Sequence, residues 1–451
     1  MAKNKKNILF LCSDQHQAAA MSCVDHPDAL TPNLDRLAGE SVRFERAFCQ
    51  SPVCVPARGS IITGLYPNRH GARVLRDPLP ADVRTIAHHF KDHGYTTAAI
   101  GKMHFVNEKR RHGFDHRIYI KDFYQTLTED EKQILAKDQD QGRGENGAPS
   151  DLPARFYRDN FYTEKAVEYL HTQSNTEQPF CAWVSFFMPH TPLVPMREYY
   201  ERYDPAKLQL PHRASKALQN GFEGHLIRAR ERGWYDQDEA SLRNSLTGYY
   251  GNISQMDNYV GRVLQALEDA GLAEDTIVVY TSDHGEMAGA HRMWTKHIMF
   301  EDAIRVPLMI RLPDKKKSGT VHSELIEHVD LYPTLCELCG LPTPAAIDGR
   351  SFAPLMRDGN YTPRTHIYSQ YDFCHNVFTA DDRYVGQPPI ITIRTERWKL
   401  NHLNWGKPEL FDLVNDPNED VNLIDDTTHT DRVKALTAQA QKIYESERPS
   451  R

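Results

Sequence analysis

One short segment with a cysteine and an arginine carries the sharpest chemical signal in this sequence. The segment Ser51–Gly71 is SPVCVPARGSIITGLYPNRHG. Pro56 favours the first turn of a helix that runs to about Thr63, which would put Cys54 at the helix N-terminus. Backbone N–H groups and the helix dipole favour an anion there, and Arg58 adds a cation. This setting favours a reactive thiolate, and the alternative is a buried structural cysteine.

Polar side chains follow four apolar, β-branched runs that we predict to be strands. In chain order, Asp14 and Gln15 follow Asn7–Cys12, Lys102 and His104 follow Thr96–Ile100, His190 follows Phe180–Phe187, and Asp283 and His284 follow Thr276–Thr281. Ligands of parallel α/β sheets bind outside the carboxyl ends of the strands, so we expect these side chains at one edge. A lone histidine or an Asp-His-Gly turn often has only a structural role. The specific signal for a functional site is that all four segments bring such residues to the same edge of the sheet.

The donors at this edge predict a divalent metal site. Asp14, Gln15, Asp283 and His284 offer two carboxylates, an amide oxygen and an imidazole. The oxygen ligands suit a hard cation such as Ca²⁺. The imidazole shifts the preference toward Mn²⁺ or Zn²⁺.

The elements that position these residues predict an α/β fold with a large, mixed, mostly parallel sheet flanked by helices. Predicted helices begin at Thr31-Pro32 and cover Pro80–Phe90, Asp159–His171 and Ala240–Ala270. Past Pro363 the pattern changes to short strands and one helix, namely Thr365–Ser369, Ile390–Arg394, Trp398–Leu403 and Thr430–Glu445. We therefore predict a catalytic domain over residues 1–360 and a C-terminal α+β subdomain on an antiparallel sheet over residues 361–451. Residues 137–153 and the basic stretch 204–238 are predicted to be irregular insertions.

Composition excludes several classes of protein. The 451 residues are 40% hydrophobic, enough for a sizeable core, and the net charge of −7 argues against a nucleic-acid binder. No apolar run reaches the roughly 18 residues of a membrane span. Eight cysteines fit a reduced compartment better than a disulfide scaffold. We expect a cytoplasmic location, or a periplasmic or secreted one if a signal peptide was removed.

The cysteine segment resembles a known signature. Cys54-Val55-Pro56-Ala57-Arg58, followed by Thr63-Gly64, is similar to the C-x-P-x-R motif of the type I sulfatases in the alkaline phosphatase superfamily. The polar residues above and Lys296 fall in that family's order, and the tail segments HVDLYPTLCELCGLP, RTERWKL and ELFDLVNDPNEDVNL are also sulfatase-like. The resemblance covers essentially the whole chain, so it implies an alkaline phosphatase-like fold.

The sequence departs from the commoner family pattern at two metal positions. Gln15 and His284 stand where many members carry Asp and Asn, and this pair resembles the branch of choline sulfatases and phosphonate monoester hydrolases. Lys102 and His104 resemble the sulfatases, because the phosphonate hydrolases usually replace that pair. No segment resembles the C-terminal tail of choline sulfatases.

The resemblance implies hydrolysis of an organic sulfate monoester by a nucleophile made from Cys54. In that family a maturation enzyme oxidises the cysteine to Cα-formylglycine, and its hydrate attacks sulfur while Asp283 accepts the proton. The implied metal ligands for one divalent ion, Ca²⁺ or else Mn²⁺, are Asp14, Gln15, Cys54, Asp283 and His284. The other implied catalytic residues are Arg58, Lys102 and Lys296, which hold the sulfate, His190, which protonates the leaving alcohol, and His104, which deprotonates the second hydroxyl of the hydrate. His291 and Arg292 are expected to border the leaving group.

Other functions remain open from the residues alone. A phosphonate monoester or phosphodiester hydrolase would share nearly every residue. A phosphomutase-like enzyme should carry Thr or Ser in place of Cys54, and a non-catalytic sulfoglycan-binding protein would not need the full catalytic set. We expect a small-molecule or saccharide sulfate as the substrate, with preference for a sulfated saccharide because of the basic insertion. The sequence leaves the exact ester and any homo-oligomer undetermined.

Overall fold

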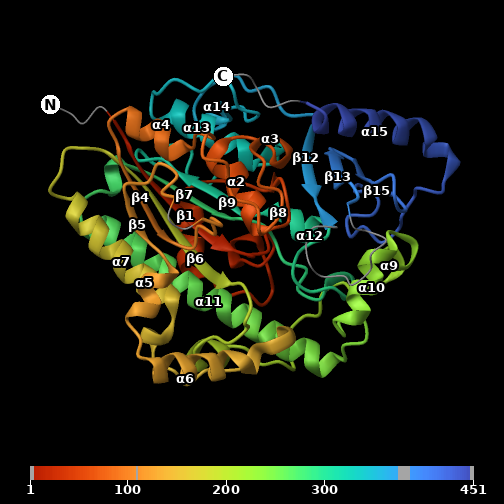
Figure 1. Ribbon diagram of the computed structural model, residues 1–451, viewed down its shortest axis with the longest axis horizontal. Coiled ribbons are helices and arrows are strands. Elements are labelled where there is room, and N and C mark those ends of the chain that lie inside the picture. Colours follow the sequence, from red (N-terminus) through yellow and green to blue (C-terminus); the bar gives the residue numbers. More distant parts are fainter. Residues whose placement is uncertain (1–4, 108–109, 374–385, 447–451) are drawn as a thin grey trace.

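The computed structural model describes residues 5–107, 110–373 and 386–446, and an eight-stranded mixed sheet lies at its centre (Figure 1). From edge to edge the strands are β10 (Val321–His322), β2 (Val42–Phe44), β9 (Leu308–Arg311), β7 (Thr276–Ser282), β1 (Asn7–Asp14), β6 (Phe180–Pro189), β4 (Thr96–Gly101) and β5 (His116–Ile118). Strand β9 runs antiparallel to β2 and β7, and the other pairs are parallel. This confirms the predicted mixed, mostly parallel sheet.

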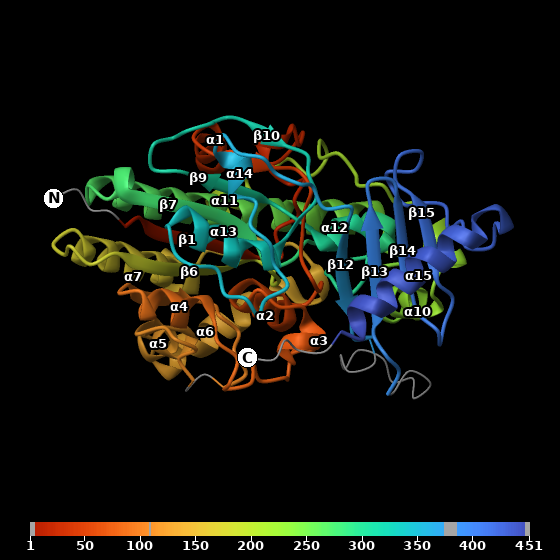
Figure 2. The same ribbon diagram turned by 90° about the horizontal axis from the view of Figure 1, so that it is seen from above.

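Helices cover both faces of this sheet because its central strands are apolar on both sides (Figures 1 and 2). Along β1, Ile8 and Phe10 pack into one core cluster, and Leu9 and Leu11 pack into another on the opposite face. One face carries α1 (Pro32–Gly39), α7 (Arg158–Gln173) and α11 (Glu239–Asp269). The other carries α2 (Cys54–Thr63), α4 (Ile86–Asp92), α13 (Leu331–Leu338) and α14 (Ala353–Met356).

The C-terminal part forms a four-stranded antiparallel sheet, as predicted (Figure 2). Its strands are β12 (His366–Tyr371), β13 (Ile390–Thr395), β14 (Trp398–His402) and β15 (Glu409–Asp412). Helix α15 (Thr430–Tyr444) packs Leu436 and Ala440 against this sheet. Buried Lys399 of β14 pairs with Glu301 and Glu419, and thereby ties the sheet to α12 (Glu301–Ile304). The domain boundary near residue 360 stays a prediction.

A short three-stranded sheet and several small helices complete the described structure. The sheet contains β11 (Ile326–Glu327), β3 (Ala47–Phe48) and β8 (Arg305–Val306). The remaining helices are α3 (Pro67–His70), α5 (Ile120–Gln125), α6 (Glu129–Gln139), α8 (Arg197–Tyr200), α9 (Lys216–Asn220) and α10 (Glu223–Glu231). No helix among the described residues, the long ones included, is long and apolar enough to cross a membrane.

The structure differs from the sequence predictions in four places. The helix expected over Pro80–Phe90 begins only at Ile86, because Thr85 caps it by accepting a hydrogen bond from the backbone of His88. The stretch 204–238, expected to be irregular, contains α9 and α10. Strand β15 was not predicted, and α6 extends into the first three residues of the predicted irregular stretch 137–153.

Candidate active site

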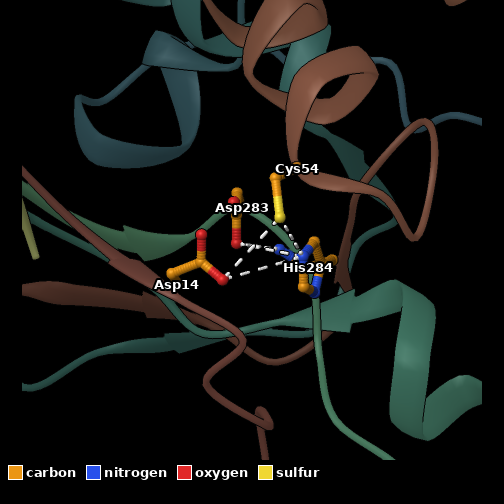
Figure 3. A group of neighbouring side chains, drawn as sticks. All are labelled: Asp14, Cys54, Asp283 and His284. Carbon is orange, nitrogen blue, oxygen red and sulfur yellow. Dashed lines mark hydrogen bonds and ion pairs between the residues drawn. The ribbon is translucent and has the colours of Figure 1, made fainter. Parts of the chain in front are cut away.

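Four chemically active side chains from three distant segments meet at the carboxyl edge of the central sheet (Figure 3). Asp14 ends β1, Asp283 and His284 follow β7, and Cys54 begins α2. One donor atom from each lies within 4.8 Å of the other three. The Cys54 Sγ is 3.2 Å from His284 Nε2 and 3.8 Å from Asp14 Oδ1.

Helix α2 places Cys54 at its first turn, as predicted. Val53 is extended and precedes the helix, and Gly64 ends it in the left-handed conformation. All residues of the helix are buried, so Cys54 is held rigidly between the helix and the sheet edge. Gly59 permits close packing within this layer, because a Cβ there would lie 2.7 Å from the His70 ring.

Arg58 joins the two carboxylates of the cluster. Its Nε is 2.8 Å from Asp283 Oδ2 and its Nη2 is 3.2 Å from Asp14 Oδ2. It also donates to the Ser185 hydroxyl at 2.7 Å and to the backbone carbonyl of Lys102. Because the guanidinium is only 1% exposed, these acceptors replace the water that a buried charge loses. Ser185 was not predicted, although a serine within the apolar strand FCAWVSFF is a signal for such a role.

Strands β4 and β6 bring Lys102 and His190 to the same carboxylate. Lys102 Nζ lies 2.5 Å from Asp14 Oδ2, and His190 Nε2 lies 4.0 Å from Asp14 Oδ1. Burial raises the pKa of Asp14, but the charges of Lys102 and Arg58 outweigh it and hold that pKa well below its ordinary value. Gly101 makes the approach possible, because at its φ of +98° a Cβ would lie 1.9 Å from the Ser185 carbonyl oxygen.

Gln15 contacts Lys296 on the other side of the cluster, and it also contacts a carboxylate, Glu286, that the sequence did not single out. The Gln15 amide oxygen accepts from Lys296 Nζ, and its amide nitrogen donates to Glu286. Glu286 also accepts from the backbone N–H of Ala288 at 2.9 Å, which fixes it in place. Burial raises the pKa of Glu286 to about 7. Its position two residues after His284 was the only sequence signal.

The electrostatic setting favours an ionised nucleophile at position 54. Burial and the Asp14 carboxylate raise the pKa of the Cys54 thiol. The cations Lys296 and Lys102 and the His284 imidazole outweigh them, so that this pKa lies well below its ordinary value.

The pKa values of Asp283 and His284 depend on each other. Burial raises the pKa of Asp283 to about 6, although the Arg58 guanidinium favours its charged form. Burial lowers the pKa of His284, but Asp283 and Cys54 carry it above its ordinary value. A carboxylate with a pKa near 6 can both accept and release a proton around neutral pH.

The donor chemistry fits a divalent cation. Oxygens of Asp14 and Asp283 face an imidazole nitrogen, with His284 Nε2 lying 4.0 Å from Asp14 Oδ1 and 3.5 Å from Asp283 Oδ1. Two buried carboxylates and one histidine are ligands that Ca²⁺ and Mn²⁺ accept. The predicted ligand Gln15 adjoins this group, since its backbone N–H donates to Asp283 Oδ1 at 3.2 Å.

The other predicted residues lie in different surroundings. His104 is exposed and lines a cavity that Lys102 and His190 also line. His291 stacks on Phe300 with ring centroids 4.1 Å apart, and Arg292 donates to the Tyr235 carbonyl. The described contacts of His291 and Arg292 do not include the Cys54 cluster, and their role in substrate binding stays a prediction.

The basic insertion supports the catalytic segment from outside. Buried Arg228 of α10 donates to the backbone carbonyl of Lys296 and to the Thr295 hydroxyl, both at 3.2 Å. From the sequence, basic clusters such as this one either face solvent or bind an anionic substrate. Arg228 does not face solvent, because it is buried and its hydrogen bonds hold the loop that carries Lys296, and substrate binding by this insertion stays a prediction.

A sequence profile of the sulfatase family matches residues 6–341. The chain belongs to the sulfatase family. A second profile, for the C-terminal part of N-sulphoglucosamine sulphohydrolase, matches residues 289–446. This membership makes the chain a sulfuric ester hydrolase, as the sequence resemblance implied.

Named relatives and solved structures extend over nearly the whole chain. A choline-sulfatase of Rhizobium meliloti is 30% identical and the match covers 94% of this chain and 83% of the relative. An N-acetylglucosamine-6-O-sulfatase of Bacteroides thetaiotaomicron is 26% identical over 99% of this chain and 88% of the relative. The crystal structure of a phosphonate monoester hydrolase of Agrobacterium radiobacter has a TM-score of 0.82 and 26% identity, covering 97% of this chain and 95% of that one. The fold is therefore alkaline phosphatase-like.

Proposed function

We propose that this chain hydrolyses a saccharide sulfate monoester, using a formylglycine formed from Cys54 by a maturation enzyme, together with one bound divalent cation, Ca²⁺ or else Mn²⁺. The observation that carries the proposal is the position of Cys54 at the start of α2, facing Asp14 and His284 among the cations Arg58, Lys102 and Lys296. The N-acetylglucosamine-6-O-sulfatase among its relatives supports a saccharide ester.

The charges in the site suit a sulfate ester. When bound, the metal supplies Lewis-acid polarisation, and a hydrated formylglycine supplies two hydroxyls, one to attack sulfur and one to expel sulfate. Lys102 and Lys296 present ammonium groups that neutralise the ester's negative charge. Arg58 holds Asp14 and Asp283 in place through its two ion pairs.

Three residues account for proton transfer. Asp283, with a pKa of about 6, accepts the proton of the attacking hydroxyl. His190 donates a proton to the leaving alcohol. Its Nε2 lies 4.0 Å from Asp14 Oδ1, and its side chain also lines the cavity beside the cluster, so it lies between the reacting group and that cavity. His104, exposed at that cavity, takes the proton of the second hydroxyl.

The test is conversion of Cys54. We expect the peptide that carries Cys54 to lose about 18 Da when the maturation enzyme is co-expressed, as the thiol becomes an aldehyde. Turnover of 4-nitrophenyl sulfate should rise in proportion to the converted fraction, and Cys54→Ala should be inactive. Full multiple turnover by wholly unconverted protein would refute the mechanism. Cys336→Ala serves as the matched control, because Cys336 is buried in α13 and outside the site.

A phosphonate monoester hydrolase is the second candidate, favoured by the likeness to the Agrobacterium radiobacter structure. The two functions differ in the atom attacked and share the charged groups that hold the substrate. Comparison of kcat/KM for 4-nitrophenyl sulfate and phenyl phosphonate separates them. Binding of sulfated saccharides without any turnover by converted protein would favour the non-catalytic alternative.

A further inference from the structure

A cavity of about 340 Å³ opens beside the catalytic cluster. Lys102 and His190, which both face Asp14, form its inner wall, and it extends from there between β4, α5 and the start of α7. Its volume is at the lower end for small-molecule sites, so it has room for a ring-sized group. This is the side on which an ester bound at Cys54 would hold its alcohol, if His190 protonates that alcohol.

The cavity has an aromatic wall that is tied to the catalytic residues. Phe187, at the end of β6, is partly exposed there. Lys102 Nζ lies 4.5 Å from the centroid of its ring, and the His190 ring lies 4.8 Å away. Phe105 and Tyr119 add further aromatic surface. Such a wall suits the flat, apolar face of a ring.

The charges on the wall are of one sign. Lys102, Arg117 and Arg158 line the cavity, and none of its described lining residues is an Asp or Glu. A cationic alcohol such as choline would therefore meet repulsion, since nothing in the described lining offers it a counter-charge. An alcohol that carries its own negative charge is matched by the cavity.

Arg158 is the cation best placed to recognise such a charge. Its guanidinium stacks 3.8 Å from the Phe187 ring centroid, which orients its N–H groups along the wall. In the part of the chain that the structure describes, no carboxylate or carbonyl accepts a hydrogen bond from it. The neighbouring Asp159 forms no hydrogen bond or ion pair with it in the described structure, because both Asp159 oxygens accept backbone N–H groups, those of Phe187 and Met188.

Arg158 differs in this respect from the other arginines nearby. Arg58 has four acceptors, and Arg117 donates to the Arg110 carbonyl at 2.8 Å. Arg155, one turn before Arg158, pairs with Glu131 at 2.7 Å. Only an unpaired, pre-oriented guanidinium gains a bidentate partner from a bound carboxylate or sulfate without losing one.

We propose that this cavity binds the alcohol part of the sulfate ester and that Arg158, stacked on Phe187, recognises a second anionic group on that alcohol. The substrate class is then a sulfate ester of a ring alcohol that also bears a carboxylate or another sulfate. The proposal rests on the proposed function for the position of the ester.

The test uses two esters that differ in one charge, 3-carboxyphenyl sulfate and 3-carbamoylphenyl sulfate. Affinity is measured by calorimetry with the Cys54→Ala protein, and kcat/KM with the converted enzyme. We expect about 10- to 100-fold preference for the carboxylate, abolished by Arg158→Gln and partly kept by Arg158→Lys, because a charge-assisted hydrogen bond is replaced by a neutral one. Arg155→Gln is the matched control and should keep the preference.

The two proposals fail in different ways. Equal affinity for both esters, no affinity for either, or equal losses on both with Arg158→Gln would overturn the role of Arg158 while sulfatase turnover could remain. A charge preference in binding that Arg158→Gln removes, without turnover of any sulfate ester, would support Arg158 and refute the proposed function. Arg158→Gln should lower the Tm only slightly, since it loses the stacking on Phe187 but no hydrogen bond within the described structure.

Discussion

At the scale of single residues, the site depends on shared charge rather than on any one pair. Arg58 contacts both Asp14 and Asp283, and Lys102 also contacts Asp14. Two carboxylates this close to each other would repel without the cations between them. Lys296, Lys102 and His284 lower the pKa of Cys54, so Lys102 both balances the charge of Asp14 and favours the ionised form of the residue at position 54.

His190 is the residue whose role is most directly testable. Burial and the cations Lys296 and Lys102 hold its pKa well below its ordinary value in the free site. An anionic ester would add a negative charge beside the ring and favour its protonated form.

We expect His190→Ala to lower kcat/KM by about 10²–10⁴-fold for a sugar 6-sulfate and far less for 4-nitrophenyl sulfate, because nitrophenolate leaves without a proton. Equal losses on both substrates would remove His190 from this role. His212→Ala is the control, since His212 pairs with Asp420 outside the cluster.

At the scale of elements, the site depends on hydrogen bonds that join the ends of strands to the first turns of helices. Asp159, in the first turn of α7, accepts the backbone N–H groups of Phe187 (2.8 Å) and Met188 (2.7 Å) at the end of β6. This fixes the segment that carries His190. Burial raises the pKa of Asp159 to about 6, although these hydrogen bonds oppose the shift.

This raised pKa predicts a pH-dependent contribution to stability. Its folded-state pKa lies above the ordinary value of 3.8, so the folded protein retains a proton that the unfolded chain releases. The contribution is complete below about pH 4 and is lost as the pH rises through about 6. In urea unfolding, the free-energy difference between wild type and Asp159→Asn should therefore be larger at pH 4 than at pH 7. A pH-independent difference would contradict this account.

At the scale of the whole molecule, the cluster links segments that are far apart in the sequence. Asp14, Cys54 and Asp283 come from β1, α2 and the end of β7, so a cation bound among them would hold the central sheet to its covering helix. Binding to the folded state alone stabilises it by about 2.7 kcal/mol at a ligand concentration 100 times Kd.

We expect extensive chelation to lower the Tm of the wild type and to abolish turnover, with Ca²⁺ restoring both. Asp14→Asn and Asp283→Asn should show little further loss of Tm on chelation, because their site is already weakened. Elemental analysis should find one divalent ion per chain. A chelated, metal-free wild type with unchanged Tm and full turnover would refute the metal site.

Much of the fold was readable from the sequence because it depends on local patterns. Apolar runs that end in polar residues predicted β1, β4, β6 and β7, and the placement of Pro56 predicted α2. Periodicity could not find β15, which is only four residues long, nor the short helices of the basic stretch. Such elements form because the surrounding structure buries them, and not because of their own propensity.

The sequence by itself determined which polar residues follow which predicted strands. From this it also determined that the predicted site lies at the carboxyl edge of the sheet. Only the tertiary structure decided which groups pair there. Ser185 and Glu286 complete the polar network, and Arg228 supports the loop that carries Lys296. The tertiary structure also places Arg158 in the wall of the cavity and His291 in a stack on Phe300. The physical reason is that burial leaves each charge only the partners that packing brings within hydrogen-bond distance, and that selection depends on contacts between segments remote in sequence.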